Sequence, residues 1–227
     1  MRTPIIIINF KNYQEVGGQR TFDLSRTAQK IADDVNVEIA LAPPTFSISS
    51  VRQHVSLPVL CQHLDDAYEG ASTGFLSPEM AKAFGAVGSI LNHSEHPINE
   101  TMISKLVERL RNLKMTSIVC AKSPEEVSSI ARSRPDFIAI EPPELIGSGR
   151  AVSRHDPSII TQSLEAKSNQ SKATRLLCGA GIIDKTDVSS AVGLGAEGIL
   201  VSSGVVKANS WHKKIFELAS GFVGSNT

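Results

Sequence analysis

Three side chains suited to acid–base chemistry occur shortly after short apolar runs of the 227-residue sequence. They are Lys11, His93 and Glu141, and the runs before them are 5–8, 87–91 and 137–140. If these runs are parallel strands of one barrel, their carboxyl ends meet at the same mouth and the three side chains converge over one pocket. Together they supply a cation, a neutral hydrogen-bond donor and a general base.

Small residues after two later runs predict a site for an anion. Glycines follow the run at 175–178, and two serines and a glycine follow the run at 198–201. These residues are Gly179, Gly181, Ser202, Ser203 and Gly204. Small residues let backbone N–H groups approach a phosphate closely, and barrels build phosphate sites from the loops after strands seven and eight. Plain tight turns are the alternative interpretation of such loops.

The segment 141–149 has the composition of a lid over the pocket. Two prolines stiffen its start, two glycines permit backbone rotation at its far end, and Leu145 and Ile146 lie between them. A lid needs stiff ends, an apolar tip and small residues where it bends. An ordinary surface loop is the alternative, but such loops seldom carry adjacent Leu and Ile without burying them.

The elements that would position these residues alternate along the chain. Eight continuous apolar runs are typical of parallel strands that are buried on both faces. The runs are 5–8, 37–41, 57–61, 87–91, 116–120, 137–140, 175–178 and 198–201. Amphipathic stretches between them predict helices at 21–35, 99–112 and 124–131, and further helix starts are expected at Asp156, Asp184 and Ser210. We therefore predict an α/β fold in which residues 1–227 form a single closed (β/α)8 barrel domain, with a doubly wound open sheet as the alternative.

The composition excludes several functional classes. Lys plus Arg and Asp plus Glu each number 23, and this balance argues against a reader of nucleic-acid backbones. The longest apolar runs are strand-sized and no signal peptide precedes them, so we expect no membrane association and a cytoplasmic location. Cys61, Cys120 and Cys178 are too few and too widely spaced for a disulfide framework or a structural zinc site, and are interpreted as buried packing residues.

The residues at the predicted strand ends closely resemble those of the triosephosphate isomerase family. The resemblance rests on Asn9-Phe10-Lys11, Asn92-His93-Ser94-Glu95 and the segment 140–149, and it covers essentially the whole chain. The short length and the Pro-Pro-Glu-Leu lid resemble the archaeal branch of that family. The resemblance implies a TIM barrel of eight parallel strands ringed by helices. It also implies an isomerase of glycolysis and gluconeogenesis that interconverts dihydroxyacetone phosphate and D-glyceraldehyde 3-phosphate through an enediol(ate), without cofactor or metal.

The resemblance also implies residue roles. Glu141 would be the base, His93 the uncharged electrophile, Lys11 the cation, Asn9 a second donor to substrate oxygen, and Glu95 a carboxylate that pairs with Lys11. The implied substrate- and phosphate-binding residues are Asn9, Phe10, Lys11, Ile146, Gly147, Gly181, Ser202 and Ser203. Cys120 would lie behind the base. The turn after His93 is expected to place its imidazole at a helix N-terminus, which would disfavour imidazolium.

The resemblance further implies a homo-oligomer, a dimer or a tetramer, built through the loop 65–77 around Thr73. The chain's own residues leave two other functions open. One is a phosphate-binding aldolase that forms a Schiff base on Lys11, which would require a lysine of lowered pKa. The other is a barrel that binds a phosphate without turnover. His54, His63, His96, His155 and His212 are interpreted as surface or packing residues.

Overall fold

The computed structural model describes residues 1–145 and 151–222, and its eight strands all lie within this part. Each predicted apolar run overlaps one strand, and β1, β2 and β5 extend one residue beyond their runs. The strands are β1 (Ile5–Asn9), β2 (Glu38–Ala42), β3 (Leu60–Cys61), β4 (Gly88–Leu91), β5 (Thr116–Ala121), β6 (Phe137–Ile140), β7 (Arg175–Cys178) and β8 (Gly198–Val201). All paired strands are parallel, in the order β2-β1-β8-β7-β6-β5-β4-β3. The predicted (β/α)8 barrel is therefore confirmed.

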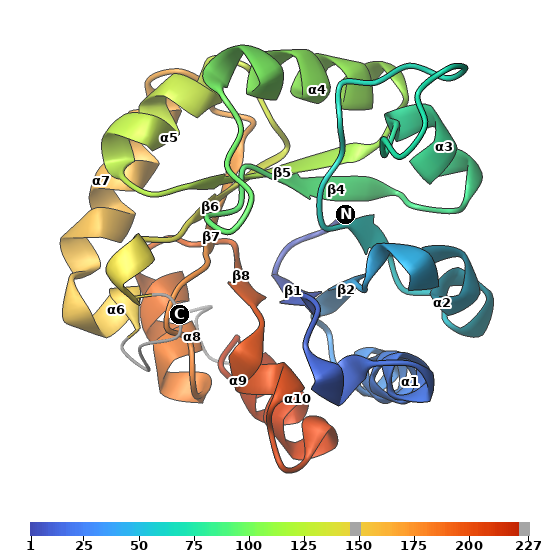
Figure 1. Ribbon diagram of the computed structural model, residues 1–227. Helices are drawn as coiled ribbons and strands as arrows, with labels where there is room; N and C mark the ends of the chain where they lie inside the picture. Colours follow the sequence, from blue (N-terminus) through green and yellow to red (C-terminus); the bar gives the residue numbers. More distant parts are fainter. Residues whose placement is uncertain (146–150, 223–227) are drawn as a thin grey trace.

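The two edges of this sheet meet just before β3. Leu41 of β2 forms a parallel bridge with Val59, and the Leu41 N–H donates to the Pro58 carbonyl at 2.9 Å. The ladder is short at this point because Pro58 has no N–H to donate, so β3 covers only the end of the predicted run 57–61. The strands thus form a ring, and the helices lie outside it (Figure 1).

Both faces of the strands are buried, which explains why the apolar runs are continuous. Ile7, Ile90 and Leu177 belong to a cluster inside the barrel, whereas Ile8 and Leu91 belong to a larger cluster between the strands and the helices. A strand places successive side chains on opposite faces. Most strand positions are therefore apolar until the strand reaches the mouth, and the buried exceptions Ser89 and Ser117 carry small hydroxyl side chains.

The predicted helix starts are confirmed by their caps. Ser123, Asp156 and Asp184 accept backbone N–H groups at the starts of three helices, and Ser210 does so at a fourth. The longer helices are α1 (Gln19–Asp34), α4 (Glu100–Asn112), α5 (Pro124–Ala131), α7 (Pro157–Ser168), α8 (Lys185–Gly193) and α10 (Trp211–Ser220). The first begins two residues before the predicted range.

Shorter helical turns connect these elements. They are η1 (Gln14–Val16), η2 (Thr45–Ser47), α2 (Ile48–His54), α3 (Pro78–Ala83), η3 (Pro143–Leu145), α6 (Val152–His155) and α9 (Ser203–Val206). None of the helices within residues 1–145 and 151–222 is both long and apolar enough to cross a bilayer.

Candidate active site

Glu141 directly follows β6 and is held in a buried, crowded position. Its side chain is buried, and its Oε2 accepts no hydrogen bond from the described residues. Burial raises the pKa of Glu141 from 4.5 to about 7, against smaller lowering effects of a Cys120 hydrogen bond and the Lys11 ammonium. This carboxyl group can therefore exchange a proton near neutral pH. Cys120 lies against it, as the resemblance implied.

His93 faces Glu141 across the barrel mouth. Its Nε2 lies 3.7 Å from the Glu141 Oε2, and its Nδ1 accepts the Glu95 N–H at 3.1 Å. Because Nδ1 is an acceptor, the proton of a neutral imidazole resides on Nε2, which faces the site. Burial and, to a smaller extent, the Lys11 charge lower the pKa of His93. The imidazole is therefore neutral at physiological pH.

The expectation that a helix N-terminus keeps His93 neutral is wrong. Residues 94–96 form a turn, closed by the His96 N–H that donates to the His93 carbonyl at 2.7 Å, and α4 begins only at Glu100. Desolvation replaces the helix dipole as the cause, because a buried imidazole disfavours its charged form.

Lys11 reaches the same space from the loop after β1. Its Nζ forms a 2.8 Å ion pair with Glu95 Oε1, and its backbone N–H donates to Asn9 Oδ1 at 3.0 Å. The backbone of Lys11 is left-handed, with a φ of 49°. The Gln62 side chain supports this turn by donating to the Lys11 carbonyl at 3.0 Å.

Phe10 does not line the cavity, contrary to its inclusion among the implied binding residues. Its side chain is fully buried in the cluster between strands and helices. Asn9 and Lys11 point toward the mouth, and strand alternation turns the residue between them to the other face.

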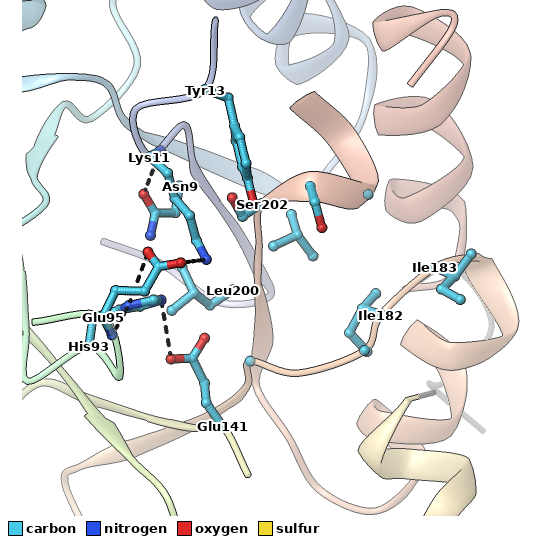
Figure 2. A pocket seen from close by; sticks show the side chains of 15 residues that line it. Asn9, Lys11, Tyr13, His93, Glu95, Glu141, Ile182, Ile183, Leu200 and Ser202 are labelled. Carbon is cyan, nitrogen blue, oxygen red and sulfur yellow. Dashed lines mark hydrogen bonds and ion pairs between the residues drawn. The ribbon is translucent and has the colours of Figure 1, made fainter. Parts of the chain in front are cut away.

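One cavity of about 420 Å³ lies at the carboxyl ends of the strands. It is lined by Asn9, Lys11, His93, Glu95 and Glu141. Figure 2 shows the Glu141 carboxyl group pointing toward His93, with Lys11 and Glu95 beside them and Ser202 farther along the cavity. The implied phosphate-binding residues in the loops after β7 and β8 also line it, and these are Gly181, Ser202 and Ser203. Gly181 has a φ of 74°, which glycine adopts without strain.

The lid is described only in part. Glu144 is exposed and Leu145 is buried, both in η3. Ile146 and Gly147, two of the implied phosphate-binding residues, lie outside the described residues.

Several lining residues were missed by sequence reasoning. Tyr13 and Ile182 line the cavity, and Gln62 lines an adjoining one of about 460 Å³. His63 and His96, interpreted above as surface or packing residues, stack with ring centroids 3.7 Å apart and also line that second cavity. The position of Gln62 directly after β3 was a usable signal, because neighbouring strand ends share one mouth.

The fold and site together define a class of protein, a (β/α)8-barrel enzyme with acid–base groups around a cavity suited to a small anion. A family model described as Triosephosphate isomerase matches residues 4–219. A triosephosphate isomerase of Cenarchaeum symbiosum is 47% identical over 96% of this chain and 97% of its own. Those of Methanothermobacter thermautotrophicus and Methanothermus fervidus are 40% and 41% identical, again over 96% of this chain and over 95% and 98% of their own. The chain belongs to the triosephosphate isomerase family, whose members interconvert dihydroxyacetone phosphate and glyceraldehyde 3-phosphate.

Proposed function

We propose that this chain catalyses the reaction of its family with Glu141 as the base that carries the proton. The observation that carries the proposal is the buried carboxyl group of Glu141, whose pKa is raised to about 7 and which faces a neutral His93. A base that acts on carbon must be close to it and shielded from water. The barrel supplies the position through β6, and burial supplies the shielding.

The proton balance of the reaction needs these two groups only. Glu141 takes a proton from carbon 1 of dihydroxyacetone phosphate, which leaves an enediol(ate), and returns it to carbon 2. The Nε2–H of His93 polarises the carbonyl oxygen and relays the hydroxyl proton between the two oxygens. Reversal of these steps converts the aldose to the ketose, so no net proton is gained or lost.

We propose that Lys11, Asn9 and Glu95 together stabilise the negative charge that forms on the substrate during the reaction. The Lys11 ammonium stabilises the negative charge that develops on the substrate oxygens, and Asn9 supplies a second donor. Glu95 holds the ammonium in place through the 2.8 Å ion pair. This pair also disfavours the aldolase alternative, because a Schiff base requires the free amine of Lys11.

The phosphate is proposed to lie at the β7–β8 side of the cavity. Gly181, Ser202 and Ser203 line that side, and Ser203 begins α9, whose first N–H groups have no acceptor within the helix. A Cβ on Gly204 would lie 3.2 Å from the Ile182 carbonyl, so the two loops pack closely. Ile146 and Gly147 complete the proposed set by resemblance alone.

The test is a coupled assay of triose phosphate interconversion on the unaltered chain and on Glu141→Gln. The amide keeps the size and polarity of the side chain but is not a base at neutral pH. We expect kcat to fall by at least about 10²-fold, since general-base contributions are roughly 10²–10⁴-fold. KM should change far less, because the proposed phosphate donors lie on other loops.

Glu38→Gln is the matched control, since Glu38 begins β2 at the other end of the barrel. It should leave kcat unchanged. Near wild-type turnover by Glu141→Gln would contradict the assignment and move the proton transfer to Glu95. Borohydride trapping of substrate on Lys11 would support the aldolase, and binding of 2-phosphoglycolate without turnover would support the non-catalytic barrel.

We also propose that residues 1–227 form one cytoplasmic domain that assembles with further copies of itself. Residues near the loop 65–77 support assembly: Tyr68, Phe75 and Phe46 are large and 70%, 60% and 102% exposed. The loop is held at its base by the Leu76 N–H, which donates to Asp65 Oδ2 at 2.8 Å. Thr73 lies in this loop, and a dimer or a tetramer would cover it.

A further inference from the structure

The side chains at the barrel mouth follow from the strands that precede them, because side chains alternate along a strand. On β6, Ala139 faces the barrel interior, so Glu141 two residues later faces the cavity. On β8, Leu200 faces the interior and Ser202 lines the cavity in the same way.

The strand β4 departs from this pattern. Ile90 faces the interior and Leu91 faces the helices, so a continued strand would turn residue 92 into the cavity and residue 93 away from it. The structure has the reverse arrangement. His93 lines the cavity, and Asn92 lines a separate space behind Glu141 together with Cys120.

The backbone of Asn92 accounts for the inversion. Its φ is 56°, in the left-handed region, which turns the chain out of the strand immediately before His93. The β4–β5 ladder ends where Leu91 pairs with Val119. Beyond this pair, the buried side-chain amide of Asn92 continues the hydrogen bonding to β5, because its Nδ2 donates to the Cys120 carbonyl at 2.9 Å.

The same side chain also closes the loop that follows. Asn92 Oδ1 accepts the Ile98 N–H at 3.0 Å, and Nδ2 also donates to Glu126 Oε1 at 3.3 Å. Asparagine is one of the few residues with a Cβ that adopt the left-handed conformation readily, because its short side chain bonds nearby backbone groups.

We propose that Asn92 is a positioning residue whose left-handed backbone directs His93 into the cavity. This rests on the proposed function, in which His93 polarises the substrate carbonyl. The amide of Asn92 stabilises the loop, whereas its backbone conformation sets the direction of the imidazole. A residue that resists the left-handed region should therefore impair catalysis more than binding.

The experiment compares Asn92→Val with Lys114→Val. Lys114 also has a φ of 56°, but it is exposed in the loop before β5, at the opposite end of the barrel. Both variants force a β-branched residue into the left-handed region, and Asn92→Val also loses the amide contacts of a buried side chain. We expect Asn92→Val to lower kcat at least about tenfold with KM within about threefold, and Lys114→Val to keep its kcat.

Asn92→Gly separates the backbone from the side chain. Glycine keeps the left-handed conformation without strain but loses the amide contacts. Its kcat should return to within about threefold of the unaltered chain while its melting temperature stays lower. If Asn92→Val does not fold, Asn92→Ala is the milder substitution, and the melting curve of each variant shows that it is folded.

Equal kcat values for the folded residue-92 variants and Lys114→Val would overturn the proposal. A glycine variant as impaired as Asn92→Val or Asn92→Ala would overturn it too, because the side chain and not the backbone would then carry the effect. An unaltered chain without turnover would contradict the proposed function itself, and is thus distinguished from these outcomes.

Discussion

At the residue scale, burial acts in opposite directions on two groups that face each other. Removal from water disfavours the charged form, so it raises the pKa of the Glu141 carboxyl group and lowers that of the His93 imidazole. At neutral pH, the carboxyl group is poised to take up or release a proton while the imidazole stays uncharged. One physical cause thus prepares both groups for different roles.

We predict that kcat/KM rises with pH and reaches half its plateau near pH 7. Glu141 acts only as the carboxylate, and its pKa is about 7, so activity is lost as the pH falls through that value. His93 titrates below 6.5 and does not define this limb. The measurement is a pH profile of kcat/KM in the coupled assay. A half-maximum at the ordinary glutamate value of 4.5 would contradict the prediction.

A cysteine substitution distinguishes the titration of Glu141 from the titration of the substrate phosphate in the pH profile. The Cys120 hydrogen bond lowers the pKa of Glu141, so Cys120→Ala should move the half-maximum to higher pH. Cys61→Ala is the matched control, because Cys61 is also buried but belongs to the cluster outside the barrel. An unmoved limb in Cys120→Ala would assign it to the substrate instead.

At the scale of elements, the catalytic position depends on how closely the ends of β6 and β7 approach. Gly179 follows β7 and its N–H donates to the Ile140 carbonyl at 3.0 Å, just before Glu141. A Cβ at Gly179 would lie 2.3 Å from the Glu141 Cγ, closer than real Cβ contacts. Position 179 therefore requires glycine, because any side chain there would clash with Glu141.

Gly179→Ala should displace the Glu141 side chain and lower kcat by about 10²-fold, the size of effect known for an ångström-scale misplacement of a reacting group. Gly193→Ala is the control, since Gly193 ends α8 and a Cβ there would meet nothing within 4 Å. It should keep kcat and at least equal stability. Full activity of Gly179→Ala would show that the base tolerates displacement.

At the scale of the whole molecule, the proposed assembly concerns the same mouth of the barrel. The second cavity shares Asn9, Lys11 and Glu95 with the first and extends to Thr45 and Leu76, beside the exposed Phe46 and Phe75. Large exposed aromatic residues around a cavity are typical of a protein interface. A partner copy seated here would also shield the Lys11–Glu95 pair.

Phe75→Asp should shift the chain toward a monomer, because a carboxylate in an apolar contact is desolvated without a partner. The molar mass measured by light scattering after size exclusion reports the change. Phe216→Asp is the matched control, since Phe216 is 49% exposed on α10, away from the loop. A monomeric unaltered chain, or an equal effect of both variants, would contradict the proposed interface.

Much of the site could be predicted because its signals are local. Lys11, His93 and Glu141 follow apolar runs, and their convergence follows from the shared mouth of parallel strands. The direction of individual side chains was less predictable. Alternation accounts for Phe10, which lies outside the barrel directly after β1, but Asn92 inverts the alternation before His93 through a conformation that no sequence period shows.

The sequence by itself determined the order of strands and helices, their caps and the chemical groups at the strand ends, because these depend on residues near one another in the chain. Tertiary structure alone decided the closure at Leu41 and Val59, the contact of Gly179 with Glu141, and the proton affinities of Glu141 and His93. These depend on which distant segments exclude water from one another. Desolvation is a property of the packed barrel, and the linear order of residues does not contain it.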